Sequence, residues 1–558
     1  MRNSLLLFAA ALLVVSAPAQ QQQHAATTKP AAAESDPVLN AMKDELTREQ
    51  QLLVLPGMQR PYFIQYRLED VQTYELLANY GALVRENQNH QRAVRVEVRV
   101  GDYTVDSSSS RGDGTIELAP SDNDPDAIRF ALWSATDQAY KNALRAYAAK
   151  QAALKQYQTP PTANDFSPAK PVTHIEPLVT FELDRDDWKH RVIEASGLYA
   201  TDAAVSSFAA DVQYSSAQVT AMVVNRYTVN TDGTMLRHGY AYYQDLINIG
   251  GQAPDGMQIA RDNGTTAITA AGLEGWPAMK KRVIDDLQSY NELRHAPVVD
   301  ADDYHGPVLF AGDAAADVVN RLFVPNIEAD RPDIGTTART QGAYASSLHS
   351  LVLPNYISVV DDPTQRAFEG QPLLGAYNVD DEGVAVAPVT LVKDGELINY
   401  DIGREPIKDF PASNGHGRAI PGQSAHSRAG VVIVKSTQNL TSDQMQAKLV
   451  ALAKDKGKNV YEVETLGGGE LMPRVLYRIT PDGKRTLVRG AAFDDLDQRT
   501  LRADIVAAGG KPWIAQSIVP VPQTAIVPML LFDDITVKRA NQEQQKLPYY
   551  PPPALTTN

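Results

Sequence analysis

The sequence predicts an α+β fold, with an N-terminal domain of mixed helix and sheet at residues 37–300 and a β-rich C-terminal domain at residues 301–540. Three observations lead to this prediction. Helical apolar spacing and strand-like alternation both occur in the first half, while short strands separated by Asp-Gly turns dominate the second half. The length of 558 residues favours two or three domains over one.

Composition excludes several classes of site and partner. The chain contains no cysteine, which excludes disulfides, thiolate zinc ligands and a cysteine nucleophile. Any metal must therefore be held by histidine, aspartate or glutamate. The net charge of -15 would repel a phosphate backbone, so we expect no nucleic-acid partner.

The N-terminus resembles an export signal. Arg2 supplies a positive charge, residues 5–15 are apolar, and Ala17 and Ala19 are small residues of the kind read by a signal peptidase. The apolar run rises only about 16 Å as a helix, against roughly 30 Å of membrane hydrocarbon. We therefore expect residues 1–19 to be a cleaved signal peptide, with an uncleaved anchor as the alternative, and no membrane span after cleavage. The mature protein would be exported, into a periplasm or outside the cell.

Two further segments are predicted to lack a packed core. Residues 20–36 are rich in glutamine, alanine and threonine and form a disordered tether, and residues 541–558 form a proline-rich tail.

The N-terminal domain begins with helical spacing at residues 38–53, followed by three predicted strands at 62–70, 73–86 and 92–103. Further helices are expected at residues 126–157, 188–199 and 278–293. Asp232-Gly233 predicts a tight hairpin, because both residue types tolerate positive φ.

Three consecutive acids, Asp380, Asp381 and Glu382, precede a predicted hairpin with an Asp394-Gly395 turn. They raise the question of a metal site. Adjacent strand residues point to opposite faces, so all three cannot converge on one ion without an unusual backbone. The sequence instead predicts solvated acids at the entrance of a strand, with Gly383 permitting the bend.

The stretch "DDEGVAVAPVTLVKDGELINY" at 380–400 resembles the Asp-Asp-Glu-Gly segment and hairpin of the TldD/PmbA family, also called modulators of DNA gyrase. Three other segments resemble family segments in the same order: residues 306–319, 413–419 and 467–491. The resemblance implies a TldD/PmbA-like fold and is closest in character to the non-catalytic PmbA/TldE-type subunit.

The family implies a zinc metallopeptidase of two related subunits, of which only the TldD type carries the metal. In that subunit an alanine-rich helix bears His-Glu-x-x-x-His, and a cysteine from a late hairpin completes the site. Here Asn320, Arg321 and Pro325 occupy the three helix positions, and the cysteine is absent. The resemblance therefore leaves the catalytic residues unknown and implies no metal and no cofactor. Pro325 is expected to end the helix.

Several residues remain candidates for binding. Glu328 and Asp330 resemble the Glu-Gly-Asp that follows the family's zinc helix, although acids after a helix are usually solvated. Gly467, Gly468 and Gly469 belong to the late Gly-rich hairpin. His416 and His426 flank a glycine-rich loop, and a chance pair is the simpler interpretation, because two ligands do not close a zinc site.

Two functional hypotheses follow. The first is a non-catalytic family member that pairs with a TldD-type zinc-bearing subunit, or with a second copy of itself, or that binds extended peptides as an added strand. The second is an active metallohydrolase with relocated zinc ligands, such as His416, His426 and an acid. The sequence leaves open whether the chain is an enzyme, and which substrate or partner it takes.

Overall fold

The computed structural model describes residues 36–108, 112, 114–156, 162–300, 304–467, 471–494 and 496–540. The predicted signal peptide, residues 20–35 of the tether, and the tail lie outside these ranges. Within them, no helix combines the length and the apolar character needed to cross a membrane.

The fold is α+β, as predicted. The helices are Pro37–Leu52 (α1), Pro125–Gln156 (α2), Arg185–Thr201 (α3), Trp276–His295 (α4), Gly312–Val318 (α5), Val324–Ile327 (α6), Ser442–Lys456 (α7) and Gln498–Ala503 (α8), with a π-helical turn at Val319–Phe323 (η4). The strands of the first half are Pro61–Asn79 (β1), Ala82–Val100 (β2), Thr115–Ala119 (β3), Thr173–Ile175 (β4), Tyr214–Asn230 (β5), Met235–Gln252 (β6) and Gln258–Ala267 (β7). The strands of the second half are Tyr304–Phe310 (β8), Ile357–Asp361 (β9), Ala367–Phe368 (β10), Gln371–Pro372 (β11), Val389–Lys393 (β12), Glu396–Leu397 (β13), Gly417–Ala419 (β14), Ala425–Ser427 (β15), Val431–Ser436 (β16), Val460–Gly467 (β17), Met472–Ile479 (β18), Arg485–Val488 (β19), Ala491–Asp494 (β20), Ile505–Ser517 (β21) and Gln523–Arg539 (β22).

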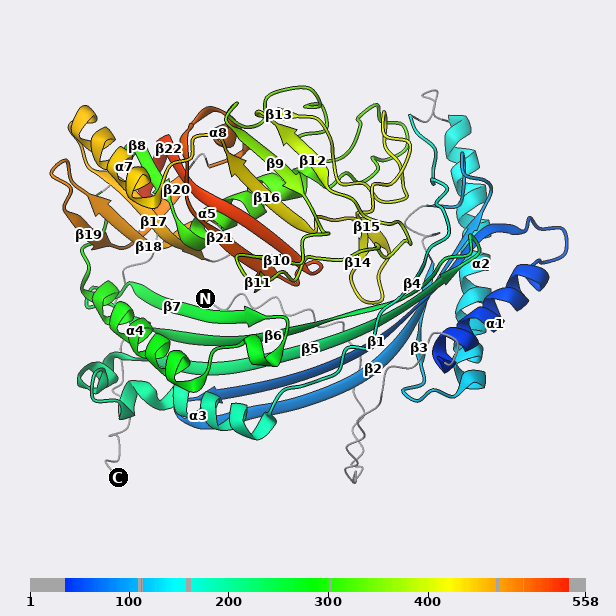
Figure 1. Ribbon diagram of the computed structural model, residues 1–558, viewed down its shortest axis with the longest axis horizontal. Helices are drawn as coiled ribbons and strands as arrows, with labels where there is room; N and C mark the ends of the chain where they lie inside the picture. The colour runs from blue at the N-terminus through cyan, green and yellow to red at the C-terminus, as the bar shows by residue number, and fades with distance from the viewer. Residues whose placement is uncertain are drawn as a thin grey trace.

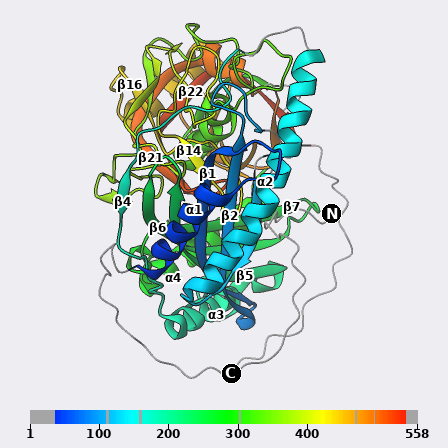
Figure 2. The ribbon, with the colours of Figure 1, turned by 90° about the vertical axis from the view of Figure 1, so that its right-hand side faces the viewer.

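A long curved sheet forms the base of the molecule (Figure 1). Its strands run in the order β3-β2-β1-β5-β6-β4, with β7 also paired to β6. Helices α1 and α2 pack against one end of this sheet, and α3 and α4 pack against the other end. Figure 2 shows α1 and α2 beside β1 and β2 at the first of these ends.

The two faces of β1 differ in chemistry. Its even-numbered residues, among them Tyr66 and Leu76, are buried against the helices. Its odd-numbered residues Arg67 and Glu69 are also buried, but they face the C-terminal domain and form an ion pair. Alternation along one strand therefore gives the sheet an apolar face for the helices and a polar face for the other domain.

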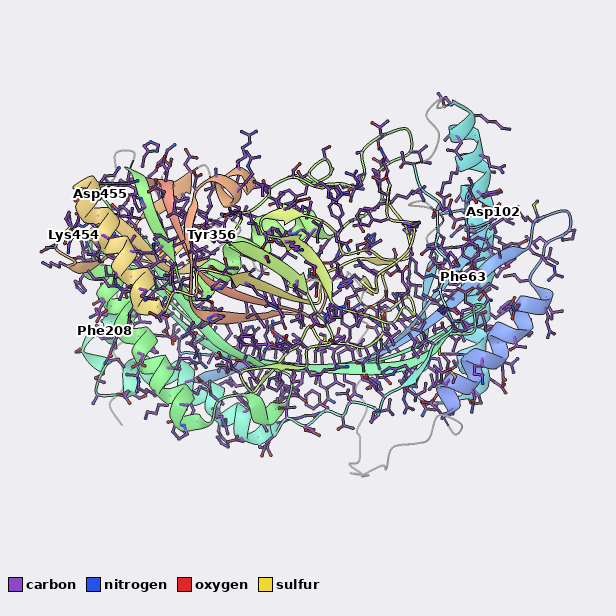
Figure 3. All side chains as sticks on the ribbon, turned by 45° about the horizontal axis from the view of Figure 1, so that its top comes forward. Phe63, Asp102, Phe208, Tyr356, Lys454 and Asp455 are labelled. Carbon is purple, nitrogen blue, oxygen red and sulfur yellow. The ribbon has the colours of Figure 1, made fainter. Side chains whose placement is uncertain are left out.

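The C-terminal domain is built on a mixed sheet in the order β13-β12-β9-β16-β22-β8-β17-β18-β19, with β20 and β21 also paired to β22. Helices α5 and α7 cover opposite faces of it. Phe310 and Phe532 pack in the core on the α5 side, and Leu309 and Leu531 pack on the α7 side. Figure 3 labels Lys454 on α7, at the opposite end of the molecule from Phe63 on β1.

The structure confirms the helices predicted in the N-terminal domain and the hairpin at Asp232-Gly233, where Gly233 N–H donates to Asn230 O at 3.0 Å. The prediction of separate strands at 62–70 and 73–86 is wrong. Both segments belong to the hairpin of β1 and β2, which turns at Tyr80 and Gly81 with positive φ. The polar residues inside β1 do not interrupt it, because the second domain covers them.

Candidate functional site

The helix that carries positions 320, 321 and 325 passes through α5, η4 and α6 without a break. Its end at Pro325 was predicted wrongly, since helical structure continues to Ile327. A π-helical turn precedes the proline, and Val324 N–H donates to Val319 O. Pro325 then lies in the first turn of α6, where a missing N–H costs little.

Asn320, Arg321 and Pro325 line a pocket of about 490 Å³, whose other wall is the end of β21 and the loop before β22. The Asn320 side-chain oxygen lies 3.5 Å from Gln523 Nε2, and Arg321 Nη2 lies 3.8 Å from Asp317 Oδ2. An amide, a guanidinium and a proline ring do not fit a zinc ion, because none supplies an imidazole or carboxylate ligand or a general base. The residues present therefore cannot form the metal site that the family resemblance would place on this helix.

Glu328 and Asp330, just beyond this helix, meet Arg428 and His426. The Arg428 Nη1 atom lies 3.4 Å from both Glu328 Oε2 and Asp330 Oδ2, and His426 Nδ1 lies 3.5 Å from Asp330 Oδ1. Burial raises the pKa of Glu328 to about 7, against the opposing effect of Arg428. Burial also opposes ionisation of Asp330, but the hydrogen bond and charge of His426 hold its pKa below the usual value. The acids therefore form an ion cluster with side chains that follow β14.

His416 is fully buried and belongs to a different cluster. Its Nε2 atom lies 3.6 Å from Asp361 Oδ2 and 3.5 Å from Asp401 Oδ1. One ligand atom from each of these three residues lies within 4.8 Å of the others. Burial alone would lower the pKa of His416, but Asp401 and Asp361 raise it to about 9.

This cluster contains His416 but not His426, so the ligand set suggested from the sequence is not the one that the fold assembles. Asp361 and Asp401 were missed by sequence reasoning. Asp401 stands out of phase with the buried Tyr400 and Ile402 of an alternating segment, which predicts a solvent-facing acid. For Asp361 the available signal was an acid at the end of an apolar segment.

The prediction that the acids 380–382 are solvated is wrong. They are buried, with exposures of 1 % for Asp380, 4 % for Asp381 and 7 % for Glu382. Asp380 Oδ2 accepts a hydrogen bond from Gly417 N–H at 2.9 Å, and Glu382 Oε2 accepts one from Arg404 N–H at 2.6 Å. Their carboxylates have different partners, in agreement with the expectation that they do not share one ion.

The pKa shifts of these three acids differ, although burial opposes ionisation in each case. Burial raises the pKa of Asp380 to about 7 and, together with the charge of Asp380, raises the pKa of Glu382 to about 8. Burial opposes ionisation of Asp381 too, but Arg226 and His238 hold its pKa well below the usual value. The Asp381 carboxylate is thus the charged member that joins the two domains.

Gly417, the first residue of β14, lies too close to Glu382 to carry a side chain. A Cβ at this position would overlap the Glu382 carboxylate. Gly467, at the end of β17, lines a pocket of about 240 Å³ together with Arg474 and Arg489. Gly468 and Gly469 lie outside the described residues.

The fold and the site together define an α+β protein whose β-rich domain rests on a long curved sheet. Its pocket helix, residues 312–327, contains no histidine and no glutamate. Residues 303–539 match the family model described as the PmbA/TldA metallopeptidase C-terminal domain. The C-terminal domain therefore belongs to the TldD/PmbA family.

Solved structures share this fold over most of the chain. TldE from Thermococcus kodakarensis is 12 % identical with a TM-score of 0.60, and the match covers 89 % of this chain and 99 % of that one. A proposed modulator of DNA gyrase from Thermotoga maritima is 14 % identical with a TM-score of 0.61, at the same coverage. Another, from Bacteroides thetaiotaomicron, is 11 % identical with a TM-score of 0.58, covering 91 % and 99 %. The comparison with curated proteins gives no significant match.

Proposed function

We propose that this protein is an exported, non-catalytic member of the TldD/PmbA family that binds extended peptides and works with a zinc-bearing TldD-type subunit. The observation that carries the proposal is the chemistry of the pocket helix. Asn320, Arg321 and Pro325 face the pocket and offer neither a zinc ligand nor a general base. Asp317 and Glu328 also line this pocket, but it lacks the His-Glu-x-x-x-His set, and such a pocket can still position a peptide.

The edge of β21 is the proposed place for the peptide. Among the described strands, β21 pairs with β22. Its other edge contacts residues 438–442 between Ala508 and Lys511, and no backbone hydrogen bond to this edge is found at Ala515 or Gln516 among the described residues. Ala515 and Gln516 line both the pocket of the helix and a second pocket of about 680 Å³. An extended peptide can add to such an edge through backbone hydrogen bonds, with side chains entering the pockets on either side.

Pairing and export rest on separate grounds. The similarity in fold to TldE supports a TldD-type partner, with a second copy of this chain as the alternative. Export rests on the charged and apolar pattern of residues 1–19. Isolation of unprocessed protein from the cytosol would contradict the export proposal.

An active metallohydrolase using His416 has less support. His416, Asp361 and Asp401 are each 0 % exposed, so a peptide carbonyl has no access to them. His426 is half-exposed but lies with Asp330 and Arg428.

The catalytic proposal is tested with the full chain and a zinc-bearing TldD-type protein. Alone, the protein should hydrolyse no peptide, and the mixture should show chelator-sensitive hydrolysis that a partner without its zinc-helix glutamate lacks. Hydrolysis by the isolated chain, abolished by a His416→Ala substitution, would favour the metallohydrolase.

Peptide binding is tested separately by the fluorescence of Trp513, which is 48 % exposed and lines the second pocket. Unstructured peptides should change its emission. Ala515→Glu should weaken binding by about tenfold, because it places a charged side chain at the position that borders both pockets. The matched control is Val506→Glu, an exposed position on the same strand outside these pockets. Equal binding by both variants would place the peptide elsewhere.

A further inference from the structure

The cluster of His416, Asp361 and Asp401 lies where three separate segments of the C-terminal domain meet. Asp361 ends β9, Asp401 follows β13, and His416 directly precedes β14. All three side chains are completely buried. The fold has therefore placed two carboxyl groups and an imidazole at one interior point without solvent.

Asn414 determines which nitrogen of His416 carries a hydrogen. The Asn414 side-chain oxygen accepts from Ile402 N–H at 2.9 Å, and its Nδ2 donates to Tyr400 O at 2.8 Å, which sets the orientation of the amide. His416 Nδ1 lies 3.0 Å from that oxygen and must be the donor. In the neutral ring, Nε2 then presents a lone pair to the two carboxylates.

At this point, side-chain atoms of His416 and Asp401 lack hydrogen-bond partners, whereas Asp361 accepts from backbone N–H groups. Among the described residues, no hydrogen bond reaches His416 Nε2 or either carboxylate oxygen of Asp401. The separations of 3.5 and 3.6 Å from Nε2 to the carboxylates exceed ordinary N–H···O distances of about 2.7–3.2 Å. Unsatisfied buried polar atoms are costly, so the cluster requires something that pairs with His416 and Asp401.

We propose that Asp361, Asp401 and His416 form a buried site for a divalent transition-metal ion, with zinc the best match. Two ligands on a tetrahedral zinc, each about 2.0–2.1 Å from the metal, are about 3.4 Å apart, close to the separations found here. Two carboxylates carry the charge that balances a divalent cation. Calcium and magnesium prefer oxygen ligands alone, so the imidazole argues against them.

The surrounding groups orient the ligands as outer partners do in metal sites. The N–H groups of Gly430 and Val431 donate to the Asp361 carboxylate at 2.8 and 2.7 Å. His416 Nδ1, the nitrogen that points away from the carboxylates, donates to the Asn414 side-chain oxygen. Both oxygens of Asp401 remain available for chelation. The metal site includes none of the residues 320, 321 and 325. It is therefore independent of the proposed peptide-binding function. Because it is closed to solvent, the metal would stabilise the domain rather than act on substrate.

Metal content of the full chain tests the proposal. The protein is purified without a histidine tag, stripped of metal, loaded with zinc and desalted, and its zinc is measured by mass spectrometry. We expect a single tightly bound zinc ion per chain. A folded protein that retains no zinc would overturn the proposal and would indicate a protonated imidazole between the two acids. This result leaves the peptidase and peptide-binding tests unaffected.

Variants locate the metal. His416→Gln and Asp401→Asn should lose the zinc, and Asn414→Ala should weaken binding by about 10–100-fold through loss of ligand orientation. The matched control is His426→Gln, at a half-exposed histidine of the neighbouring strand β15, which should retain the metal. Zinc retained by His416→Gln would overturn the assignment.

X-ray absorption at the zinc edge of the wild-type protein decides the question even where a variant fails to fold. The expected spectrum contains one imidazole with oxygen donors and no sulfur. Two or more imidazoles would overturn the assignment.

Discussion

The Asp381 carboxylate of the C-terminal domain pairs with the Arg226 guanidinium of β5, and both side chains are buried where the domain meets the long sheet. Arg226 also contacts Glu69 of β1 at 2.7 Å and donates to Ala419 O at 3.0 Å. His238 of β6 lies 3.3 Å from Asp381. The polar face of the sheet and the acidic segment 380–382 are therefore the two halves of one interface.

Asp381→Asn should destabilise the folded protein by about 3 kcal/mol, because it leaves Arg226 buried with one partner fewer. The measurement is urea unfolding followed by circular dichroism. Since the folded pKa of Asp381 is depressed, the wild-type advantage should be present above about pH 4 and disappear as the pH falls through the folded pKa. Asp285→Asn, which removes an exposed pair with Lys281, should cost less than about 0.5 kcal/mol. Equal effects of the two variants would contradict an interface role for Asp381.

Glu382 should contribute stability that is lost as the pH rises, whereas the contribution of Asp381 is lost as the pH falls. Glu382→Gln should remove this dependence. The folded pKa of Glu382 is raised to about 8 from an ordinary 4.5, so the folded state holds a proton that the unfolded state releases. The wild type should therefore lose stability as the pH rises from about 4.5 to 8, by at least about 2 kcal/mol relative to the variant. Unfolding free energies at several pH values check this, and parallel profiles for the two proteins would contradict it.

Arg404→Ala should destabilise the contact between the domains by about 3–5 kcal/mol. The Arg404 side chain is fully buried, donates to Ser167 O at 2.8 Å and to Asp232 Oδ2 at 2.8 Å, and lies 4.0 Å from the centre of the Phe166 ring. Arg404→Lys should recover only part of the loss, since an ammonium cannot reproduce the planar fork or the stacking.

Limited proteolysis and thermal unfolding measure the effect of both Arg404 variants. Arg366→Ala, at an exposed arginine of the same domain, serves as the control and should change little. Full recovery by lysine would mean that charge alone matters at position 404.

Zinc should raise the melting temperature of the metal-free protein. At a free zinc concentration of 100 times the dissociation constant, binding to the folded state alone stabilises it by about 2.7 kcal/mol. Differential scanning calorimetry with zinc and with chelator should show this shift for the wild type and not for Asp401→Asn. A chelator-sensitive shift that persists in Asp401→Asn would place the stabilising metal outside the cluster.

Elements with a strong local period were predicted well. Helices α2 and α4 follow from apolar residues at helical spacing, because contacts three and four positions apart need no knowledge of the rest of the fold. The predicted division of β1 falls just after three polar residues, Arg67, Glu69 and Asp70. Their partners, including Arg226 and Arg92, come from other strands and could not be inferred from neighbouring letters.

The sequence by itself determined that positions 320, 321 and 325 cannot hold zinc and that no cysteine can complete such a site. Ligand chemistry belongs to each side chain whatever the fold. Only the tertiary structure decided that residues 380–382 are buried, and that Asp361, Asp401 and His416 meet at one point. Burial and proximity depend on which segments pack together, and these segments are distant in the chain.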